Sequence, residues 1–545
     1  ILDCRHKTGA RSAQLPPGNG GWAVKWIVQS ALALGFLGYA SLAGAQSHDP
    51  IPIEPVSGEQ YPHAIFLEHA AEPAIAPDHP PLSDIPPMPM PQASDAQLRG
   101  RSSDEVSIHD ADTGETLVLP LGVPSGLREA RSNGPAYAGI GGSTSASGSA
   151  PGLEAFSNMV VAGGLSGWPR SGNVKLVMRF TSSIDSAVYT YVCSGSMADG
   201  GVVQTAGHCV YARDPDGNQI FAWADEIWVY PAWDGVNADT SNVFQHFGRA
   251  RGTHYLAGSN WVNDGNWDAD LGAIRIRRDS RPGLGLLTGW FGWSWGGDCA
   301  SQQARTYYNF SYPAENCGGG LHTGRTMYYW DGSFDSCPGN QLRIDTTAGC
   351  LTALWGGMSG SGAYYISGDQ RYVHAVASTS NRTTIGNYAR FWEQWVTDRQ
   401  TYIDTTRGTA VDFSPLRFRT GGSSTVVAGS PASGPFTVLV ANATNNDPAL
   451  RTITVRVYLS TNSTISATDT LLATWNYSID FAPMQLRTLN VPAPIIPASA
   501  SLGTRWMGVV LDAGSDAFPE NNATIEWDTQ KITVISSAIF KNGFE

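Results

Sequence analysis

The sequence has 545 residues, with 47 acidic and 34 basic side chains and a formal net charge of −13. This length allows about two to four domains. A hydrophobic content of 42% excludes disorder of the whole chain. The chain is acidic overall and lacks the clustered Lys and Arg that bind nucleic acid. No nucleic-acid partner is therefore expected.

Residues 1–45 are interpreted as an N-terminal extension and a secretory signal peptide. Lys25 supplies a positive charge, an apolar run follows over 27–42, and the string AGA at 43–45 forms a small-residue cleavage site. A membrane anchor is the alternative, but the apolar run is short for a span. We therefore expect a protein secreted outside a bacterial cell, with no membrane attachment once the leader is removed.

Residues 46–155 are interpreted as a Pro-rich prosegment and a Gly/Ser linker. Twelve prolines lie between Pro50 and Pro91, and such a run predicts extended, solvated chain. A short amphipathic stretch at 106–121 precedes the linker. This segment holds fifteen acidic and four basic side chains, so most of the net charge would leave with it. A surface-attachment stalk is the alternative interpretation.

Residues 156–408 have the texture of a many-stranded antiparallel β-domain. Short β-branched and aromatic runs alternate there with Gly, Asn and Asp turns. Aromatic residues recur at helical spacing only near the end of this region. The expected elements are strands at 174–180, 227–230, 271–276 and 372–377, and a helix at 389–402.

A second all-β block occupies residues 412–538, and 539–545 form a C-terminal tail. The regular spacing of its apolar runs predicts an immunoglobulin-like β-sandwich. Acidic residues in its turns are interpreted as solvated, with a calcium site as the alternative. The expected strands are 436–441, 452–459, 470–475, 486–491, 506–511 and 532–535.

Six cysteines follow the leader, at positions 193, 209, 299, 317, 337 and 350. An even number in an exported chain predicts disulfides that pair all of them. No CxxC pair or Cys/His cluster has the spacing of a zinc site. We therefore expect neither a metal nor another cofactor. The partners of Cys299, Cys317, Cys337 and Cys350 stay open.

Three strings carry the chemistry: TAGHC at 205–209, DADLGAI at 268–274 and GGMSGSG at 356–362. A serine hydroxyl becomes a nucleophile when an imidazole takes its proton and a carboxylate holds that imidazole. N–H donors must also face the developing oxyanion. Each string alone is a weak signal, but the order His, Asp, Ser along one β-rich exported chain is specific.

The strings TAGHC and GMSGSG resemble those of chymotrypsin-fold (trypsin-like) serine proteases. A finer resemblance, to bacterial glutamyl endopeptidases and their relatives, comes from TGWFGW at 288–293, SYP at 311–313 and IDT at 344–346. The resemblance covers roughly 158–405. It implies a mainly β fold with two six-stranded antiparallel β-barrels, and protein or peptide substrates.

The resemblance implies a role for each matching residue. Ser359 would be the nucleophile, His208 the general base and then acid, and Asp270 the group that orients the imidazole. The N–H groups of Gly357 and Ser359 would form the oxyanion hole. A disulfide between Cys193 and Cys209 would bracket the histidine.

Two rivals stay open from the residues themselves. Asp268 could orient the imidazole, but Asp270 is preferred because it directly precedes a buried strand, and Asp268 is interpreted as a solvated turn residue. Ser361 is the rival nucleophile, and Ser359 is preferred because it has the full G-x-S-G-S-G context.

Two positions depart from the family pattern. Met358 precedes the nucleophile where trypsin-like enzymes activated by a new N-terminus carry Asp, so that buried salt bridge is absent. In the glutamyl enzymes a His on the strand after the nucleophile helps to bind the substrate carboxylate, and His374 is the specificity candidate. The glycines that usually follow it are missing, and the alternative register places Ala377 in the pocket wall. The absence of an acid at 352–355 argues against a preference for Lys or Arg.

The C-terminal strings VYLST at 457–461 and ISATDTLL at 465–472 resemble the CARDB-type adhesion module. That resemblance implies that the block binds a surface or the substrate. The whole chain is thus predicted to be a secreted serine endopeptidase made as a preproprotein. The alternative is a catalytically silent, trypsin-fold adhesion protein that acts through its C-terminal sandwich.

Overall fold

The computed structural model describes short stretches before residue 165 and most of 165–537. The early stretches are 57–60, 85–88, 105–119, 129–130 and 160–162. The longest later gaps are 214–221, 236–246, 277–282, 316–321, 346–353 and 445–449. The predicted leader and C-terminal tail lie outside the described residues, as do Cys317 and Cys350.

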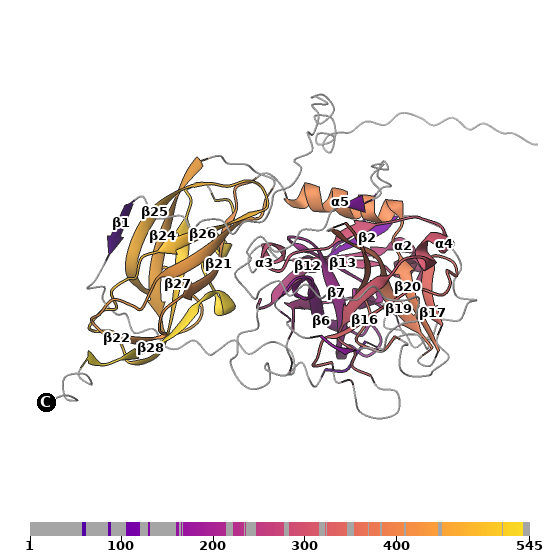
Figure 1. The fold of residues 1–545 in the computed structure, drawn as a ribbon, viewed down its shortest axis with the longest axis horizontal. Helices are drawn as coiled ribbons and strands as arrows, with labels where there is room; N and C mark the ends of the chain where they lie inside the picture. The colour runs from indigo at the N-terminus through magenta and orange to yellow at the C-terminus, as the bar shows by residue number, and fades with distance from the viewer. Residues whose placement is uncertain are drawn as a thin grey trace, which may run out of the picture. The chain divides into compact units, whose positions relative to one another are not determined.

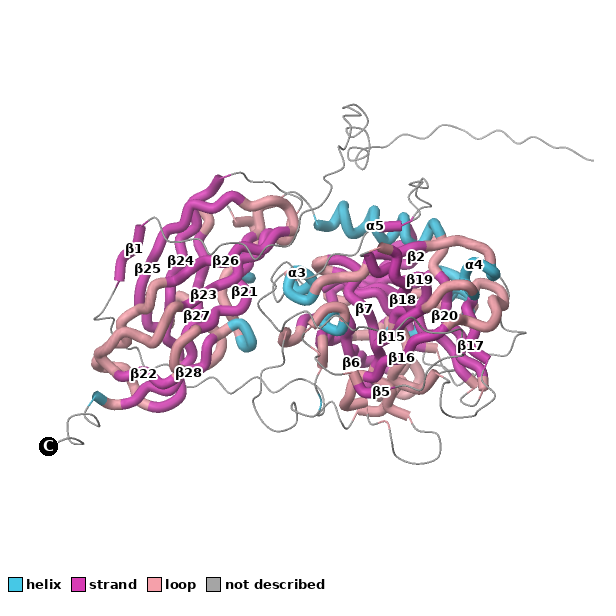
Figure 2. The backbone as a smooth tube through the Cα atoms, viewed as in Figure 1, coloured by secondary structure: helices cyan, strands magenta, loops and turns pink. Residues whose placement is uncertain are grey.

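A closed barrel of six antiparallel strands forms the first sheet (Figures 1 and 2). The strands follow one another as β11, β6, β7, β8, β13 and β12, and β12 pairs back with β11 where Trp228 lies opposite Arg251. Alternate residues Val174, Leu176 and Met178 are fully buried, as expected for a small barrel filled by side chains. The strands are β6 (Asn173–Thr181), β7 (Val188–Asp199), β8 (Val202–Thr205), β11 (Glu226–Pro231), β12 (Ala250–Gly258) and β13 (Gly272–Ile276). This barrel confirms the first of the two predicted barrels.

Two strands from the predicted prosegment extend this sheet beyond β12. β2 (Val106–Asp110) pairs antiparallel with β12, and β3 (Thr116–Leu119) pairs with β2. Val106 and Ile108 are buried, and the hydroxyl oxygens of Ser107 and Ser259 lie 2.8 Å apart. The amphipathic stretch is therefore part of a packed sheet.

A second upstream piece, residues 85–88, also packs against the body. Ile85 and Met88 are buried. Val192 N donates to Pro86 O at 3.0 Å, and Met88 N donates to Val192 O at 3.0 Å. The prediction that the Pro-rich run is solvated is wrong for these residues, because two of their apolar side chains are covered by the protein.

The second sheet has nine strands, of which seven follow one another as β17, β20, β19, β18, β15, β16 and β5. β14 pairs parallel with β19 and antiparallel with β4. No pair of strands closes this sheet among the described residues, so it differs from the predicted second closed, wholly antiparallel barrel. The strands are β4 (Glu129–Ala130), β5 (Val160–Val161), β14 (Gly292–Ser294), β15 (Tyr307–Ser311), β16 (Tyr328–Gly332), β17 (Gln341–Asp345), β18 (Gly362–Ser367), β19 (Gln370–Ser380) and β20 (Ile385–Arg390).

The predicted terminal helix is α5 (Glu393–Arg407), which buries Trp395 and Val396. It begins later than predicted because Ala389 still belongs to β20 and pairs with Gln341. No helix in the described part of the chain is both long and apolar enough to cross a membrane. Shorter elements are β9 (Tyr211–Ala212), β10 (Ala222–Trp223), α2 (Ser259–Asp264), α3 (Leu284–Thr288) and α4 (Cys299–Gln303).

The C-terminal block consists of two sheets around one apolar core. Phe418 and Val440 enter this core from one sheet, and Val455, Leu472 and Val509 from the other. The strand orders are β21-β23-β26 and β1-β25-β24-β27-β28-β22. All six predicted strands are confirmed. The strands are β1 (Ser57–Gln60), β21 (Phe413–Thr420), β22 (Thr425–Val427), β23 (Phe436–Asn442), β24 (Leu450–Ser460), β25 (Thr470–Asp480), β26 (Gln485–Val491), β27 (Gly503–Asp512) and β28 (Gln530–Ile535).

Candidate active site

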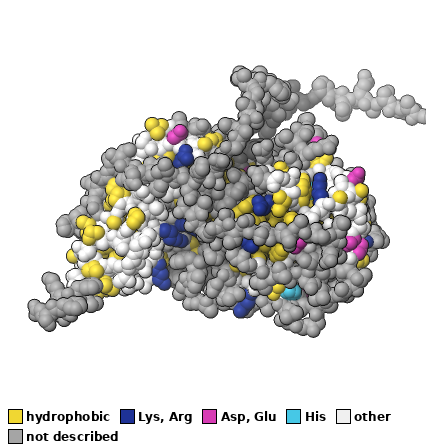
Figure 3. Space-filling model, in the orientation of Figure 1, with side chains coloured by type: hydrophobic (Ala, Val, Ile, Leu, Met, Phe, Trp, Pro, Cys, Tyr) yellow, Lys and Arg dark blue, Asp and Glu magenta, His cyan; other side chains and the backbone are white. Residues whose placement is uncertain are grey.

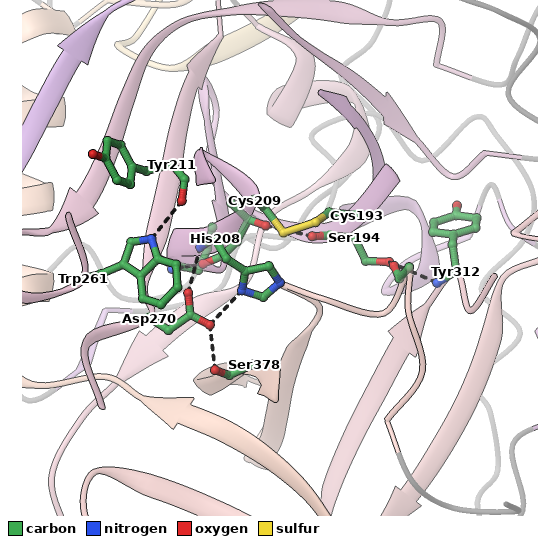
Figure 4. Close-up of a disulfide and its surroundings, with 12 residues drawn as sticks. Cys193, Ser194, His208, Cys209, Tyr211, Trp261, Asp270, Tyr312 and Ser378 are labelled. Carbon is green, nitrogen blue, oxygen red and sulfur yellow. Dashed lines mark hydrogen bonds and ion pairs between the residues drawn. A yellow bond between two sulfur atoms is a disulfide. The ribbon is translucent and has the colours of Figure 1, made fainter. Parts of the chain in front are cut away.

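His208 lies in a short 3-10 turn, η3 (Gly207–Cys209), directly after β8. Its side chain is buried, and Nδ1 lies 2.8 Å from Oδ2 of Asp270 (Figure 4). The backbone N–H of the same histidine donates to Oδ1 of Asp270 at 2.7 Å. A disulfide between Cys193 and Cys209 ties this turn to β7. The carboxylate therefore fixes both the main chain and the ring of His208.

Asp270 follows η4 (Trp267–Ala269) and lies two residues before Gly272, where β13 begins. Its side chain is fully buried. Ser378 on β19 donates its hydroxyl to Oδ2 at 2.6 Å, so donors from two other parts of the chain surround the carboxylate (Figure 4). Ser378 was not among the predicted site residues, because its contact with Asp270 depends on how β19 is placed.

Ser359 lies in the loop before β18, and its loop packs against the residues that precede His208. Ser194 N donates to Ser359 O at 2.8 Å, and Thr205 Oγ1 donates to Ser194 O at 2.9 Å. A Cβ added at Gly360 would meet Thr205 Oγ1 at 2.0 Å. The Ser359 hydroxyl and His208 Nε2 are both buried, and neither has a hydrogen-bond partner among the described residues.

The backbone of Gly357 takes a conformation that glycine allows and other residues resist, with φ of +91°. A Cβ there would lie 2.4 Å from Tyr312 O. Ser194 holds this loop as well, because its hydroxyl donates to Gly357 O at 2.7 Å and accepts from Tyr312 N at 3.0 Å. Sequence reasoning missed Ser194, although it directly follows a predicted disulfide cysteine.

The two rival residues make other contacts. Asp268 is buried rather than solvated, and its Oδ1 accepts from Asn340 N at 2.9 Å. The expectation of a solvated turn residue is wrong, because the turn that contains Asn340 covers this carboxylate. The Ser361 hydroxyl accepts from Asn309 Nδ2 at 2.9 Å. Asp268 therefore binds Asn340, and Ser361 binds Asn309. Neither of these contacts involves the imidazole of His208.

His374 lies on β19 and is buried. Its Nδ1 is 2.9 Å from the hydroxyl of Ser294, and its ring packs near those of Tyr307 and Tyr365. Burial, with the positive charge of Arg305 and of Arg390 adding to it, lowers the pKa of His374 to about 3. The residue that contacts the nucleophile loop is Ala377, whose carbonyl accepts from Gly360 N at 2.8 Å.

One group of side chains has the spacing of metal ligands. The ligand atoms of Cys193, His208 and Cys209 lie within 4.8 Å of one another. Both sulfur atoms are joined in the disulfide, whereas a metal-binding cysteine is a thiolate. These residues therefore do not fit a metal in this oxidation state. The second disulfide joins Cys299 to Cys337, which assigns two of the four open partners.

No family model matches the chain. A similar curated protein is the "Extracellular metalloprotease" of Bacillus subtilis (strain 168), which is 26% identical over 126 residues. The match covers 23% of this chain and 34% of that protein, so the chain spans about a third of the relative's length.

Three solved proteins are similar to parts of the chain. One is the protease Anisep from Arthrobacter nicotinovorans, at 20% identity and a TM-score of 0.31, over 40% of this chain and 90% of that one. A Glu endopeptidase in complex with MPD has 17% identity and a TM-score of 0.32, over 45% and 97%. The thermostable serine protease AL20 from an extremophilic microorganism has 15% identity and a TM-score of 0.33, over 43% and 98%. Because these identities and scores are low, we infer function from the geometry of the site itself.

Proposed function

We propose that the protein is a serine endopeptidase that hydrolyses peptide bonds through an acyl-enzyme. The observation that carries this proposal is the state of His208. One ring nitrogen is held by the buried carboxylate of Asp270, and the other is buried without a hydrogen-bond partner among the described residues, as is the Ser359 hydroxyl. These two atoms belong to the two groups that would exchange a proton.

In the proposed reaction His208 Nε2 takes the proton of Ser359 as the hydroxyl oxygen attacks the scissile carbonyl carbon. The imidazolium then gives this proton to the leaving amine, the C–N bond breaks, and an ester to Ser359 remains. A water molecule that His208 deprotonates attacks the ester and frees the serine and the acid product. Asp270 holds Nδ1 of the ring and stabilises the imidazolium.

The N–H groups of Gly357 and Ser359 are the proposed donors to the oxyanion. The positive φ of Gly357 and the contacts of the loop with Ser194 support this role, because they hold the backbone in one arrangement. A preorganised donor of this kind stabilises the transition state by about 3–4 kcal/mol.

The direct test is the Ser359→Ala variant, with Ser361→Ala as the matched control. We expect S359A to fold and to lose peptidase activity, and S361A to retain it. A fluorophosphonate should label the wild type but not S359A. Undiminished proteolysis by S359A would refute the proposal. A properly folded wild type that takes no label would favour the silent adhesion protein.

The Bacillus subtilis protein is named an extracellular metalloprotease, and we carry over only extracellular proteolysis. The two disulfides support secretion, because such bonds persist in oxidising compartments. We expect activity to survive a metal chelator and to be lost with a fluorophosphonate. The reverse pattern would contradict a serine mechanism.

We also propose that the chain is made as a proprotein. Residues 85–88 bind the backbone of Val192. Two residues further along the same strand, Ser194 N donates to Ser359 O. An extended peptide binds readily to the free edge of a strand. The upstream segment occupies such an edge close to the nucleophile, so we expect its removal to open the site.

Protein or peptide substrates are proposed, without a requirement for glutamate. The lowered pKa of His374 leaves its ring neutral at neutral pH, and its Nδ1 faces Ser294. A neutral ring in that place offers no positive charge to a substrate carboxylate. On the face in Figure 3 the described Lys and Arg side chains lie in small separate groups rather than in one basic patch, in keeping with a substrate other than nucleic acid.

For the C-terminal block we propose an immunoglobulin-like sandwich of CARDB type that binds a surface or the substrate. Two sheets around a single apolar core support the sandwich. Deleting residues 412–538 should weaken binding to the natural surface or substrate and spare hydrolysis of a short peptide. Equal loss of both would contradict an accessory role.

A further inference from the structure

The segment 312–315 holds the peptide that joins Gly356 to Gly357 from one side. Gly356 O accepts from Ala314 N at 2.8 Å. Gly356 N donates to Oε2 of Glu315 at 3.0 Å. Two consecutive residues of this segment thus bind both main-chain polar groups of Gly356.

The bond from Ala314 determines where the Gly357 N–H points, and the bond to Glu315 holds the preceding peptide unit of Gly356. In a trans peptide the carbonyl of one residue and the N–H of the next point in opposite directions. Because Gly356 O faces Ala314, the N–H of Gly357 faces away from the 312–315 segment. Half a turn of this peptide unit would exchange the two directions and remove the N–H from the proposed oxyanion hole.

The loop needs such a restraint because glycine has the most freely rotating backbone of all residues, and two glycines are adjacent here. The side chain that precedes the nucleophile, Met358, is uncharged and offers no strong acceptor to hold the loop. Met358 is buried, and its sulfur lies 3.4 Å from Trp355 N. A carboxylate that accepts a backbone N–H forms a stronger, charge-assisted bond than a thioether.

We propose that Glu315 is a positioning residue that keeps the oxyanion hole formed by holding Gly356 N. The inference rests on the proposed function. Glu315 would not touch the substrate. It would act through its hydrogen bond to Gly356 N and not through an electrostatic effect of its charge on the substrate.

Two substitutions separate the hydrogen bond from the charge. In Glu315→Gln the side chain keeps an oxygen acceptor at the same distance from the backbone and loses the charge. In Glu315→Asp the charge stays, but the side chain is one methylene group shorter, so its carboxylate oxygen lies farther from Gly356 N. We expect E315Q to keep kcat within about threefold of wild type and E315D to lower kcat by about tenfold or more, with KM little changed in both.

A second readout is binding of a peptide aldehyde, whose adduct with Ser359 places an oxyanion in the hole. E315D should bind the aldehyde about tenfold more weakly, and the matching uncleaved peptide alcohol with unchanged affinity. Wild-type kcat and aldehyde affinity in E315D, or a kcat loss in E315Q equal to that in E315D, would overturn the role of Glu315. Failure of the proposed function is distinguishable, because wild type itself would then neither hydrolyse peptides nor take the fluorophosphonate.

Discussion

The hydroxyl of Ser378 donates to Oδ2 of Asp270 at 2.6 Å, and the same oxygen lies 2.8 Å from Nδ1 of His208. One carboxylate oxygen thus connects β19 of the second sheet to the histidine beside the first barrel. The charge that would steady an imidazolium is held in place by a residue from the other sheet.

We predict that Ser378→Ala lowers kcat by about ten- to a hundredfold and leaves KM nearly unchanged. A hydrogen bond to a buried charged group contributes about 1.5–3 kcal/mol, and here it supports a charge needed in the transition state. Steady-state kinetics with a peptide substrate measure the change. The control is Ser171→Ala, since Ser171 is also buried and donates to Thr288 O at 2.6 Å. A comparable kcat loss in the control would assign the effect to general destabilisation.

We predict that Asp270→Asn and Asp268→Asn separate activity from stability. Asp270 contacts His208, whereas Asp268 accepts from Asn340 N. D270N should lower kcat by about 10⁴-fold, as expected when the imidazole is held in the wrong tautomer. D268N should keep kcat within about tenfold and unfold at lower urea. If D268N proved the less active of the two, the assignment of Asp270 would be wrong.

We predict that His374 makes the protein less stable in acid. Its pKa is lowered from 6.5 to about 3 in the folded protein. Between these values the unfolded chain binds a proton that the folded chain does not. The free energy of unfolding therefore falls as pH drops from 6.5 toward 3, by at most about 1.4 kcal/mol per pH unit.

Urea unfolding of wild type and His374→Asn at several pH values between 7 and 4 checks this prediction. The variant should lose part of the acid sensitivity, whatever its stability at neutral pH. His322→Asn is the control, because this ring is only partly buried, although burial lowers its pKa too. Identical pH slopes for wild type and H374N would contradict the prediction.

We predict that the double substitution Ile85→Asp and Met88→Asp raises the activity of the uncut chain about tenfold or more. Burying each apolar side chain contributes about 1.5–3 kcal/mol, and a buried unpaired carboxylate reverses that gain. The segment would leave the edge at Val192. Hydrolysis is measured while mass spectrometry confirms that the chain is intact. Activity equal to that of the uncut wild type would show that the segment does not block the site.

The sequence motifs predicted His208 and Asp270, which the structure brings together, because their strings are local and need no knowledge of strand pairing. Ser378 was not predictable in this way. The pairing of β19 with β20 is irregular between Ala377 and Thr379, and the position of such an irregularity depends on the neighbouring strand. His374 shows the same limit, because its surroundings come from Ser294 and Tyr307 on other strands.

The predicted prosegment shows a different limit of local patterns. The alternation of apolar and polar residues over 106–121 indicated an amphipathic stretch. It could not indicate that β12 offers an edge with which Val106–Asp110 would pair. Likewise, Glu315 gave no signal, because its partner Gly356 lies in a loop forty-one positions away along the chain.

The pairing of β2 with β12 has a consequence for maturation. A cut in the Gly/Ser linker would break one covalent bond, but every hydrogen bond between Val106–Asp110 and His254–Gly258 would remain. The fragment that contains β2 would then stay bound as a second chain, and only a further cut between the 85–88 stretch and β2 would let that stretch leave Val192. Expression from a start within the linker would omit β2 and β3, the strands that extend the sheet beyond β12, and would leave His254–Gly258 without this strand partner.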